Sequence, residues 1–383
     1  MYWIPLFEIL EQRGIGPCLV NARHMKNVPG RRTDWHECQW LQFLHSVGLL
    51  RAGFRPGQDV CAVRTLLRHR SELVAAASQP VQHMHKALTQ MNLQIHHVIN
   101  DITGLTGLAI VDAILAGQRD GAELRDPHIQ ADDETIRKSL AGNWRPEPLF
   151  TLGQSRALYR IYQQQIVNCD LHIEKMLREF EPRVDPAERP LPPDRKRNRA
   201  GGKRRKKNGL PHPEFDLRTE TYKLFGVDVT QIPGLEENAL PLFSEVGRDM
   251  SRWPSAGHFV SWLALCPDND ISGGKLLWRG ARKVKNRAGH LFRMAAFSLH
   301  HSLTPLGNYL RRMKAMLDPE AATMATAHKI AVIFYTMVKN QVEYDETIWD
   351  ARDAQREKRL EAKLKRQAKQ LGYELVPIEP EAA

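Results

Sequence analysis

The amino-terminal part of the chain combines a helical pattern with a short extended one. Apolar residues Leu6, Ile9 and Leu10 fall on one side of a helix over residues 4–13, and glycines end this helix. The apolar run over residues 17–22 then predicts a buried strand. A helix, a turn and a strand in this order indicate a piece of an α/β sheet.

A basic loop and a long helical region follow. Residues 23–32 form the loop, and a helix is expected over residues 33–40. From about residue 60 to residue 180 the pattern is largely helical. In its last part apolar residues recur every three or four positions, which is typical either of a helix packed in a bundle of one chain or of a coiled-coil seam. These positions are Leu158, Tyr162, Ile166, Cys169, Ile173, Met176 and Phe180.

Residues 181–213 interrupt the helical pattern, because proline is frequent there and apolar residues are few. Within residues 191–209 there are nine Lys or Arg and one Asp, so this stretch carries eight of the eleven net positive charges of the chain. A basic segment of this kind is typical of an arm that binds nucleic acid. A solvated hinge is the alternative interpretation.

A second compact region is expected over residues 221–342. Its sequence Ile232-Pro233-Gly234-Leu235 predicts a turn into a helix that begins near Glu236. A helix near residues 259–266 leads into a glycine-rich turn at residues 271–275, and two or three further helices follow.

The composition favours a polyanionic partner. A length of 383 residues suffices for two or three domains, and a net charge of +11 with a pI near 9.5 favours nucleic acid first and an acidic membrane second. The five cysteines are scattered without zinc spacing, which indicates reduced thiols. The most apolar run, residues 330–338, is too short to span a bilayer, and the first residues do not resemble a signal peptide. We therefore expect a cytoplasmic protein with no membrane contact, whose tail, residues 350–371, is a charged helix.

Asp34 and Glu37 form the first candidate site. On a helix, residues three apart project their carboxylates to one side, and paired carboxylates suit a hard cation such as Mg²⁺. The neighbouring Arg31 and Arg32 could hold a phosphate of DNA or RNA. The alternative is an ordinary acidic pair on an exposed helix, which most such helices carry.

Ser272 is the second candidate. The glycines after it let a backbone approach closely and leave amide groups free to face an anion. A serine among cations could attack a phosphodiester while the cations stabilise the charge of the transition state. The alternative is a simple turn beside a phosphate-binding surface. The cations that follow are Lys275, Arg279, Arg282, Lys283, Lys285, Arg287 and Arg293.

Other chemistries lack their motifs. The sequence has no HExxH, no GxxxxGK[ST] and no GxGxxG after a strand, which argues against a metalloprotease, a nucleotide hydrolase and a dinucleotide-dependent enzyme. The histidine pairs show no metal-ligand pattern.

Two stretches together resemble a known family. Residues 20–34, with residues 37–41, resemble the amino-terminal domain of the DEDD insertion-sequence transposases, the "IS one-ten" family, relatives of the Piv DNA invertase. Ile232-Pro233-Gly234, residues 259–267 and Ser272-Gly273-Gly274-Lys275 resemble the carboxy-terminal transposase domain of that family, in the same order. The resemblance covers nearly the whole chain.

This resemblance implies an α/β plus all-α architecture. Residues 1–100 would form an incomplete RuvC-like domain of the ribonuclease H fold, residues 101–185 a helical coiled-coil region, and residues 186–220 a basic linker. Residues 221–345 would form a mostly helical transposase domain, and residues 346–383 a charged helical tail.

It also implies an insertion-sequence transposase or site-specific recombinase, which cleaves and joins DNA by metal-assisted, serine-mediated phosphodiester transfer. Asp34 matches the third and Glu37 the fourth of four acids that bind Mg²⁺, although most members have Asp at the fourth. Ser272 matches the nucleophile, and Ile271 stands where many members have another serine. DNA, a guide RNA and a second copy of the chain are the expected partners. The residues expected to bind nucleic acid are Arg31, Arg32, Arg64, Arg68, Arg195, Lys196, Arg197, Lys203, Arg204, Arg205, Lys206, Lys207, Lys275, Arg279, Arg282, Lys283, Lys285 and Arg287.

In relatives the first two acids and the central strands of the sheet precede the Tyr-Trp that stands here as Tyr2-Trp3. The resemblance therefore implies that the amino-terminal start of the catalytic domain is missing from this chain. We expect the 383-residue chain by itself not to transpose DNA. The alternative to an enzyme is a catalytically dead remnant that binds only nucleic acid or the full-length transposase.

Overall fold

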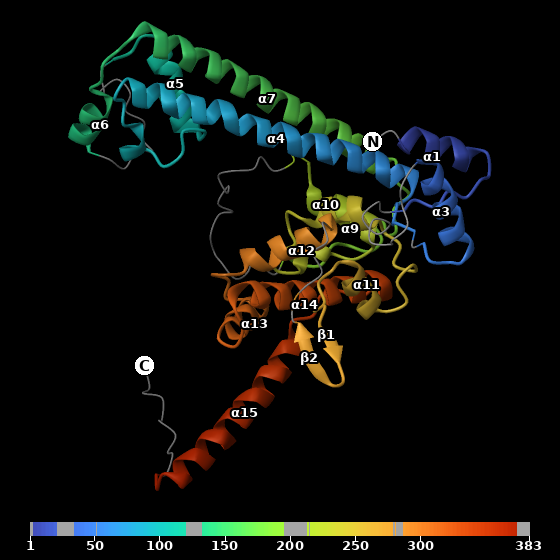
Figure 1. Cartoon of the computed structure of the whole chain (residues 1–383). Coiled ribbons are helices and arrows are strands. Elements are labelled where there is room, and N and C mark those ends of the chain that lie inside the picture. The colour runs from blue at the N-terminus through green and yellow to red at the C-terminus, as the bar shows by residue number, and fades with distance from the viewer. Residues whose placement is uncertain are drawn as a thin grey trace. The chain divides into compact units, whose positions relative to one another are not determined.

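The computed structural model describes residues 3–20, 34–50, 52–119, 132–194, 213, 215–278, 280 and 286–373. These residues are mostly helical, with thirteen α-helices and one two-stranded sheet among them (Figure 1). The chain forms two compact units, Met1–Cys61 and Ala62–Ala383, and each is described by itself. The expected dominance of helices beyond residue 60 is confirmed.

The first unit contains helices α1 (Trp3–Gln12) and α3 (Asp34–Ser46). Both were expected from the sequence. Arg55 forms ion pairs with two glutamates of α1. Its guanidinium donates to Glu8 Oε1 at 2.8 Å and to Glu11 Oε2 at 2.7 Å. This double ion pair ties the segment after α3 back to the first helix.

The expected buried strand is not present in the described part of this unit. Val20 forms a single antiparallel bridge with Ala52, and Cys18 is exposed. A strand is buried only where neighbouring strands and a covering layer enclose it, and the described residues of this unit supply neither. The RuvC-like fold therefore stays a prediction.

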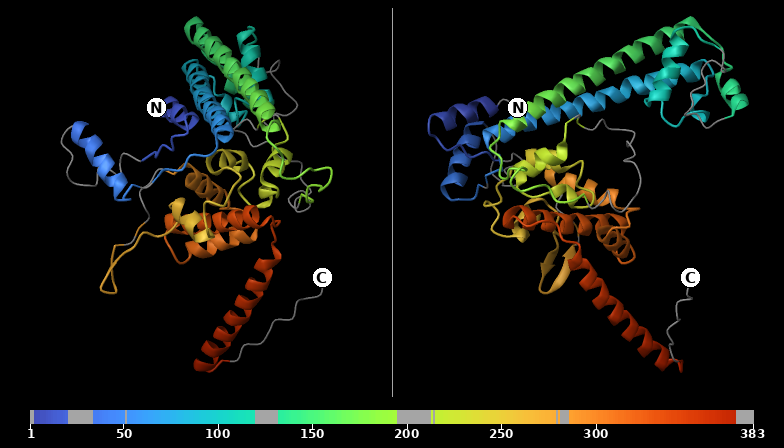
Figure 2. Two further views of the ribbon diagram at one scale, coloured as in Figure 1. Left: turned by 90° about the vertical axis from the view of Figure 1, so that its right-hand side faces the viewer. Right: turned by 180° about the vertical axis from the view of Figure 1, so that it is seen from behind.

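In the second unit, helices α4 (Gln58–Gln90) and α7 (Pro146–Arg178) run antiparallel, side by side (Figures 1 and 2). A buried ion pair joins them: the Arg70 guanidinium donates to both carboxylate oxygens of Asp170, and only 2% of the Asp170 side chain is exposed. The Sγ of Cys169 lies 3.6 Å from the carbonyl oxygen of Leu66 on α4.

Smaller helices close the far end of this α4–α7 hairpin. They are η1 (Ile95–His97), α5 (Leu105–Leu115) and α6 (Asp133–Leu140). Apolar side chains from all of them form one core with the ends of α4 and α7. Its largest members are Met84, Leu88, Met91, Leu93, Ile95, Ile102, Ile110, Ile114, Ile136, Leu140 and Leu152.

The heptad-like positions on α7 divide into two groups. Ile166, Cys169 and Ile173 are buried, whereas 48% of Leu158 is exposed. Because Cys169 contacts α4 of the same chain, packing within one chain accounts for the buried positions. A coiled-coil dimer stays a prediction.

The carboxy-terminal region is built around one long helix, α14 (Pro319–Asn340). The Phe334 ring of α14 lies 5.4 Å from Phe225 and 5.6 Å from Phe292, measured between ring centroids, and all three are fully buried. The remaining helices are α9 (Leu217–Phe225), η2 (Val229–Gln231), α10 (Ala239–Val246), α11 (Ala256–Trp262), α12 (Arg287–Ser298), α13 (Pro305–Lys314) and the charged α15 (Thr347–Gln370).

Among the described residues, α14 alone is long and apolar enough to cross a membrane. Half of its most apolar window is buried inside the protein, and α11, α12 and α13 pack against it. Its apolar side chains therefore belong to the core of this region.

The Ile232-Pro233-Gly234 sequence forms a tight turn beneath α12. Ile232 and Leu235 are fully buried, and Gly234 adopts φ +88° directly against the carbonyl of Ala295. The following helix begins at Ala239, not near residue 236, because residues 232–238 form successive turns. The expectation of a turn is confirmed, and the expected start of the helix is wrong by three residues.

Part of the predicted basic linker is attached to the carboxy-terminal region. Tyr222 donates its hydroxyl to the carbonyl of Arg189, and Arg218 donates to that of Pro192. Gln231 donates to the carbonyl of Pro193 at 3.4 Å. Residues 186–194 are therefore held against α9 and η2, while residues 195–212 lie outside the described residues.

Candidate functional site

Ser272 lies at the tip of a β-hairpin. Strands β1 (Asp270–Ser272) and β2 (Lys275–Trp278) pair antiparallel, and Ser272 is opposite Lys275. The two residues between them, Gly273 and Gly274, have φ +55° and +76°, the backbone that a two-residue hairpin turn of type I′ requires. Only glycine adopts this conformation freely, which explains the Gly-Gly sequence.

Sequence reasoning predicted the turn but not the two strands. Gly-Gly is a hairpin turn signal when it stands between two strand-like runs, but only the segment after it, Lys275–Trp278, is apolar. Both strands are only three or four residues long, so their period of two is hardly visible.

The hairpin presents Ser272 to solvent, and Lys275 is exposed as well. Residues directly opposite each other in an antiparallel pair project to the same side of the sheet. The ammonium of Lys275 therefore shares a side with the Ser272 hydroxyl. A cation beside an accessible hydroxyl can offset negative charge that develops on an attacked phosphate.

Hydrogen bonds fix the backbone before and after the hairpin. The amide of Asp268 donates to the carbonyl of Gly280 at 2.7 Å. Asn286 caps α12 through its side chain, which accepts from Gly289 N, and donates to the carbonyl of Trp262 at 2.9 Å. Arg287 is exposed in the first turn of α12. The expected cations at positions 279, 282, 283 and 285 lie outside the described residues.

Asp34 and Glu37 lie one turn apart at the start of α3, as expected. Glu37 is half-buried; the side chain of Asp34, together with Arg31 and Arg32, lies outside the described residues. In the described part of the chain, no group of three or more His, Cys, Asp or Glu could hold a metal ion.

Mg²⁺ is commonly bound by one or two carboxylates together with waters and substrate phosphates, so Asp34 and Glu37 could supply part of its ligands. Mg²⁺ binding stays a prediction of the resemblance. Ser272 belongs to the other compact unit.

Arg64 and Arg68, expected to bind nucleic acid, interact with the end of α10. Arg64 Nε donates to the carbonyl of Ser244 at 2.8 Å, and Arg68 Nη2 donates to Glu245 Oε1 at 2.8 Å. Cations near the carbonyls of a helix C-terminus are stabilising. These two side chains thus tie α4 to α10, a role that the sequence did not indicate because Glu245 is far away along the chain.

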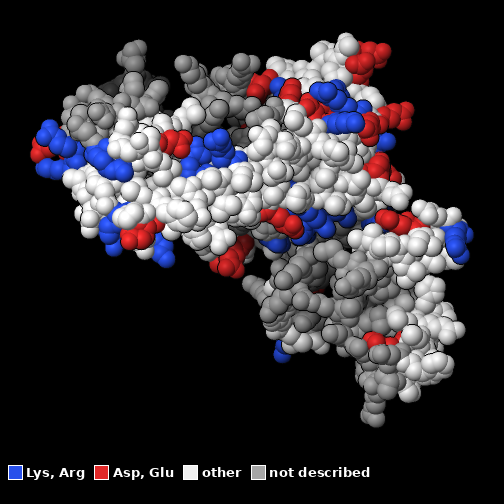
Figure 3. Space-filling model, turned by 90° about the horizontal axis from the view of Figure 1, so that it is seen from above, with Lys and Arg blue, Asp and Glu red and all other residues white. Residues whose placement is uncertain are grey.

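The remaining cations are distributed over the surface. In the view of Figure 3, Lys and Arg side chains are scattered among Asp and Glu side chains and do not gather into one basic face. The cations of the basic segment, Arg195–Arg197 and Lys203–Lys207, lie outside the described residues.

Residues 228–309 match the family model of the transposase IS116/IS110/IS902 family. A comparison with curated proteins gives no match. The matched segment runs from η2 into α13 and includes the 232–234 turn and the hairpin with Ser272. The match supports a transposase of the IS110 family, and with it DNA transposition in general and DNA as a partner.

Proposed function

We propose that this chain is a DNA recombinase of an insertion sequence in which Ser272 is the nucleophile. The observation that carries the proposal is the position of Ser272: it lies within the matched transposase segment, on a hairpin tip that exposes it to a large substrate. Lys275 on the opposite strand supplies a neighbouring positive charge.

The chemistry is a pair of phosphoryl transfers. The Ser272 oxygen attacks a phosphorus of the DNA backbone, a P–O bond to the DNA breaks, and the leaving DNA oxygen takes up a proton as the serine loses one. The product is a phosphoserine ester between protein and DNA. A DNA hydroxyl then attacks the same phosphorus, which joins the strands and returns the proton and the free hydroxyl to Ser272.

The basic segment would supply electrostatic affinity for the partner. Each neutralised phosphate of duplex DNA contributes roughly −0.9 to the slope of log K against log salt concentration. Replacing the basic residues of this segment by serine should flatten that slope. An unchanged slope would show that the segment acts only as a tether. The residues to replace are Arg195, Lys196, Arg197, Lys203, Arg204, Arg205, Lys206 and Lys207.

The resemblance adds three further elements to the proposal: a guide RNA, a homo-oligomer and a cytoplasmic location. The second candidate function is a protein that binds nucleic acid without cutting it.

A recombination assay in cells separates the two functions. The chain is expressed together with the DNA that flanks its coding sequence, and new DNA junctions are amplified and sequenced. In a chain that also carries the two upstream acids that the resemblance implies, recombination should give junctions, and Ser272→Ala should give none. Ser298→Ala is the matched control, because Ser298 is also exposed and its hydroxyl bonds only locally, to the carbonyl of Ala295. Binding of the DNA without junctions would favour the second function.

A further inference from the structure

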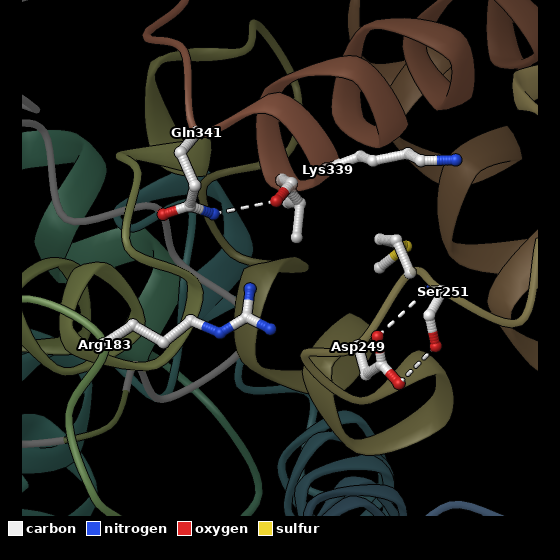
Figure 4. A pocket seen from close by; sticks show the side chains of 7 residues that line it. Arg183, Asp249, Ser251, Lys339 and Gln341 are labelled. Carbon is white, nitrogen blue, oxygen red and sulfur yellow. Dashed lines mark hydrogen bonds between the residues drawn. The ribbon is translucent and has the colours of Figure 1, made fainter.

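A cleft with a volume of about 460 Å³ opens where the segment after α7 meets the end of α14. This volume is in the range of small-ligand sites. Arg183, Asp249, Lys339 and Gln341 are among its lining residues. Figure 4 shows the Arg183 guanidinium reaching into the space between Gln341 and Asp249.

Ser251 donates two hydrogen bonds to the carboxylate of Asp249, which lines the cleft. Asp249 accepts the backbone N–H of Ser251 at 2.8 Å and the Ser251 hydroxyl at 2.6 Å, one on each oxygen (Figure 4). These hydrogen bonds lower the pKa of Asp249, so it is ionised at neutral pH. The negative charge of Asp249 raises the pKa of Arg183, but Arg183 forms no ion pair with any carboxylate of the described residues.

Two neighbouring cations, Arg248 and Lys339, donate hydrogen bonds to neutral acceptors. Arg248 donates to the backbone carbonyl of Glu181 at 2.6 Å. Lys339 donates to the carbonyl of Pro254 at 2.8 Å and to the hydroxyl of Tyr335 at 2.6 Å. Hydrogen bonds to carbonyls and hydroxyls leave the positive charges in place. The lining of the cleft thus carries two cations, Arg183 and Lys339, and one carboxylate, Asp249.

The cations also act on one another. Burial and, after it, the charge of Arg248 lower the pKa of Arg183, while the charge of Asp249 raises it. A bound anion would relieve this repulsion. The guanidinium fork matches two oxygens of one phosphate, and an open cleft admits a phosphate that is part of a polymer.

We propose that this cleft is a phosphate-binding site for the nucleic-acid backbone, with Arg183 as the direct contact and Arg248 as supporting charge. The inference depends on the proposed function in one respect, namely that the partner is DNA. The shared chemistry is a phosphate group, whether in DNA or free in solution.

The test is fluorescence anisotropy of the full chain with a labelled DNA duplex over a series of salt concentrations. Arg183→Gln should weaken binding about tenfold and lower the magnitude of the salt slope by about 0.9, the contribution of one phosphate. Arg183→Lys, which keeps the charge but loses the fork, should keep the slope and recover part of the affinity. The matched control is Arg178→Gln, because Arg178 is exposed and paired with Glu174 at the end of α7.

Equal losses in Arg183→Gln and Arg178→Gln would overturn the site, since the effect would then be one of net charge alone. Unchanged DNA affinity in Arg183→Gln would also overturn it. Protection of the wild-type chain, but not of Arg183→Gln, against thermal unfolding by inorganic phosphate, together with unchanged DNA affinity, would identify a free-phosphate site instead. If the wild-type chain binds no DNA, the proposed function fails first.

Discussion

Replacing Gly234 by alanine should destabilise the carboxy-terminal region, although alanine generally favours folding over glycine. A Cβ atom at this position would lie 2.4 Å from the carbonyl oxygen of Ala295 and 3.0 Å from the Ser298 hydroxyl oxygen. Ala295 is fully buried on α12, so relief requires a backbone shift and not the rotation of a flexible side chain.

Three contributions set the magnitude. The positive φ of +88° costs a side-chain-bearing residue about 1–2 kcal/mol. Overpacking against backbone costs about 1–3 kcal/mol. The smaller conformational entropy of alanine in the unfolded chain returns about 0.4–1 kcal/mol. The net loss of unfolding free energy is therefore about 1–5 kcal/mol.

Thermal and urea unfolding, followed by circular dichroism, measure this change. At about 3 °C per kcal/mol, the melting temperature of the region should fall by roughly 3–15 °C. Gly273→Ala is the matched control, since Gly273 also has a positive φ but no atom within 4 Å of its added Cβ. A Gly234→Ala protein as stable as the wild type would refute the close approach of the 232–234 turn to α12.

Three further substitutions test the rest of the fold. Phe334→Ala should cost about 3–5 kcal/mol in unfolding free energy, because it empties the centre of the aromatic core around α14; a loss below about 1 kcal/mol in urea unfolding would place Phe334 elsewhere. Asp170→Ala should cost about 3–5 kcal/mol by breaking the buried ion pair with Arg70, and an unchanged urea midpoint would contradict the α4–α7 pairing. Burial raises the pKa of Glu343 in the folded protein. The contribution of Glu343 to the free energy of unfolding is therefore fully present below its pKa in the unfolded chain, about 4.3, and is lost as the pH rises through its pKa in the folded protein. Glu343→Gln keeps an acceptor for Asp228 N and should remove this decline, which urea midpoints between pH about 4 and about 7 would show.

The helices were predictable because their apolar residues recur with helical spacing over long stretches. The 33 residues of α7 are an example: Ile166, Cys169 and Ile173 were predicted on its apolar side and are buried. The tight turn at Gly234 was predictable from proline and glycine. These features depend on neighbours within a few residues.

Features that depend on distant residues were not predictable. Arg64 and Arg68 have the spacing of a basic patch, and only the fold brings Glu245 to them. The segment over residues 186–194 has the composition of a linker, but Arg218 and Tyr222 hold its carbonyls. Single polar contacts of this kind leave no periodic pattern.

The candidate site divides in the same way. Ser272 between small and basic residues stood out as a local motif, and the hairpin confirms that it is accessible. The Arg183 cleft was not found, because residues near positions 183, 249 and 339 share no pattern along the chain.

The most direct measurement of the proposed chemistry is a search for DNA covalently attached to Ser272. The purified protein, which also carries the two upstream acids that the resemblance implies, is incubated with labelled DNA that contains its recombination site and is then denatured and separated by gel electrophoresis. The serine mechanism predicts a labelled band at the mass of the protein plus DNA and a phosphorylated or nucleotide-bearing Ser272 peptide after nuclease and protease digestion. Ser272→Ala should give neither while it still binds DNA. An adduct formed equally by the Ser272→Ala protein would assign the nucleophile to another residue and contradict the proposed role of the hairpin.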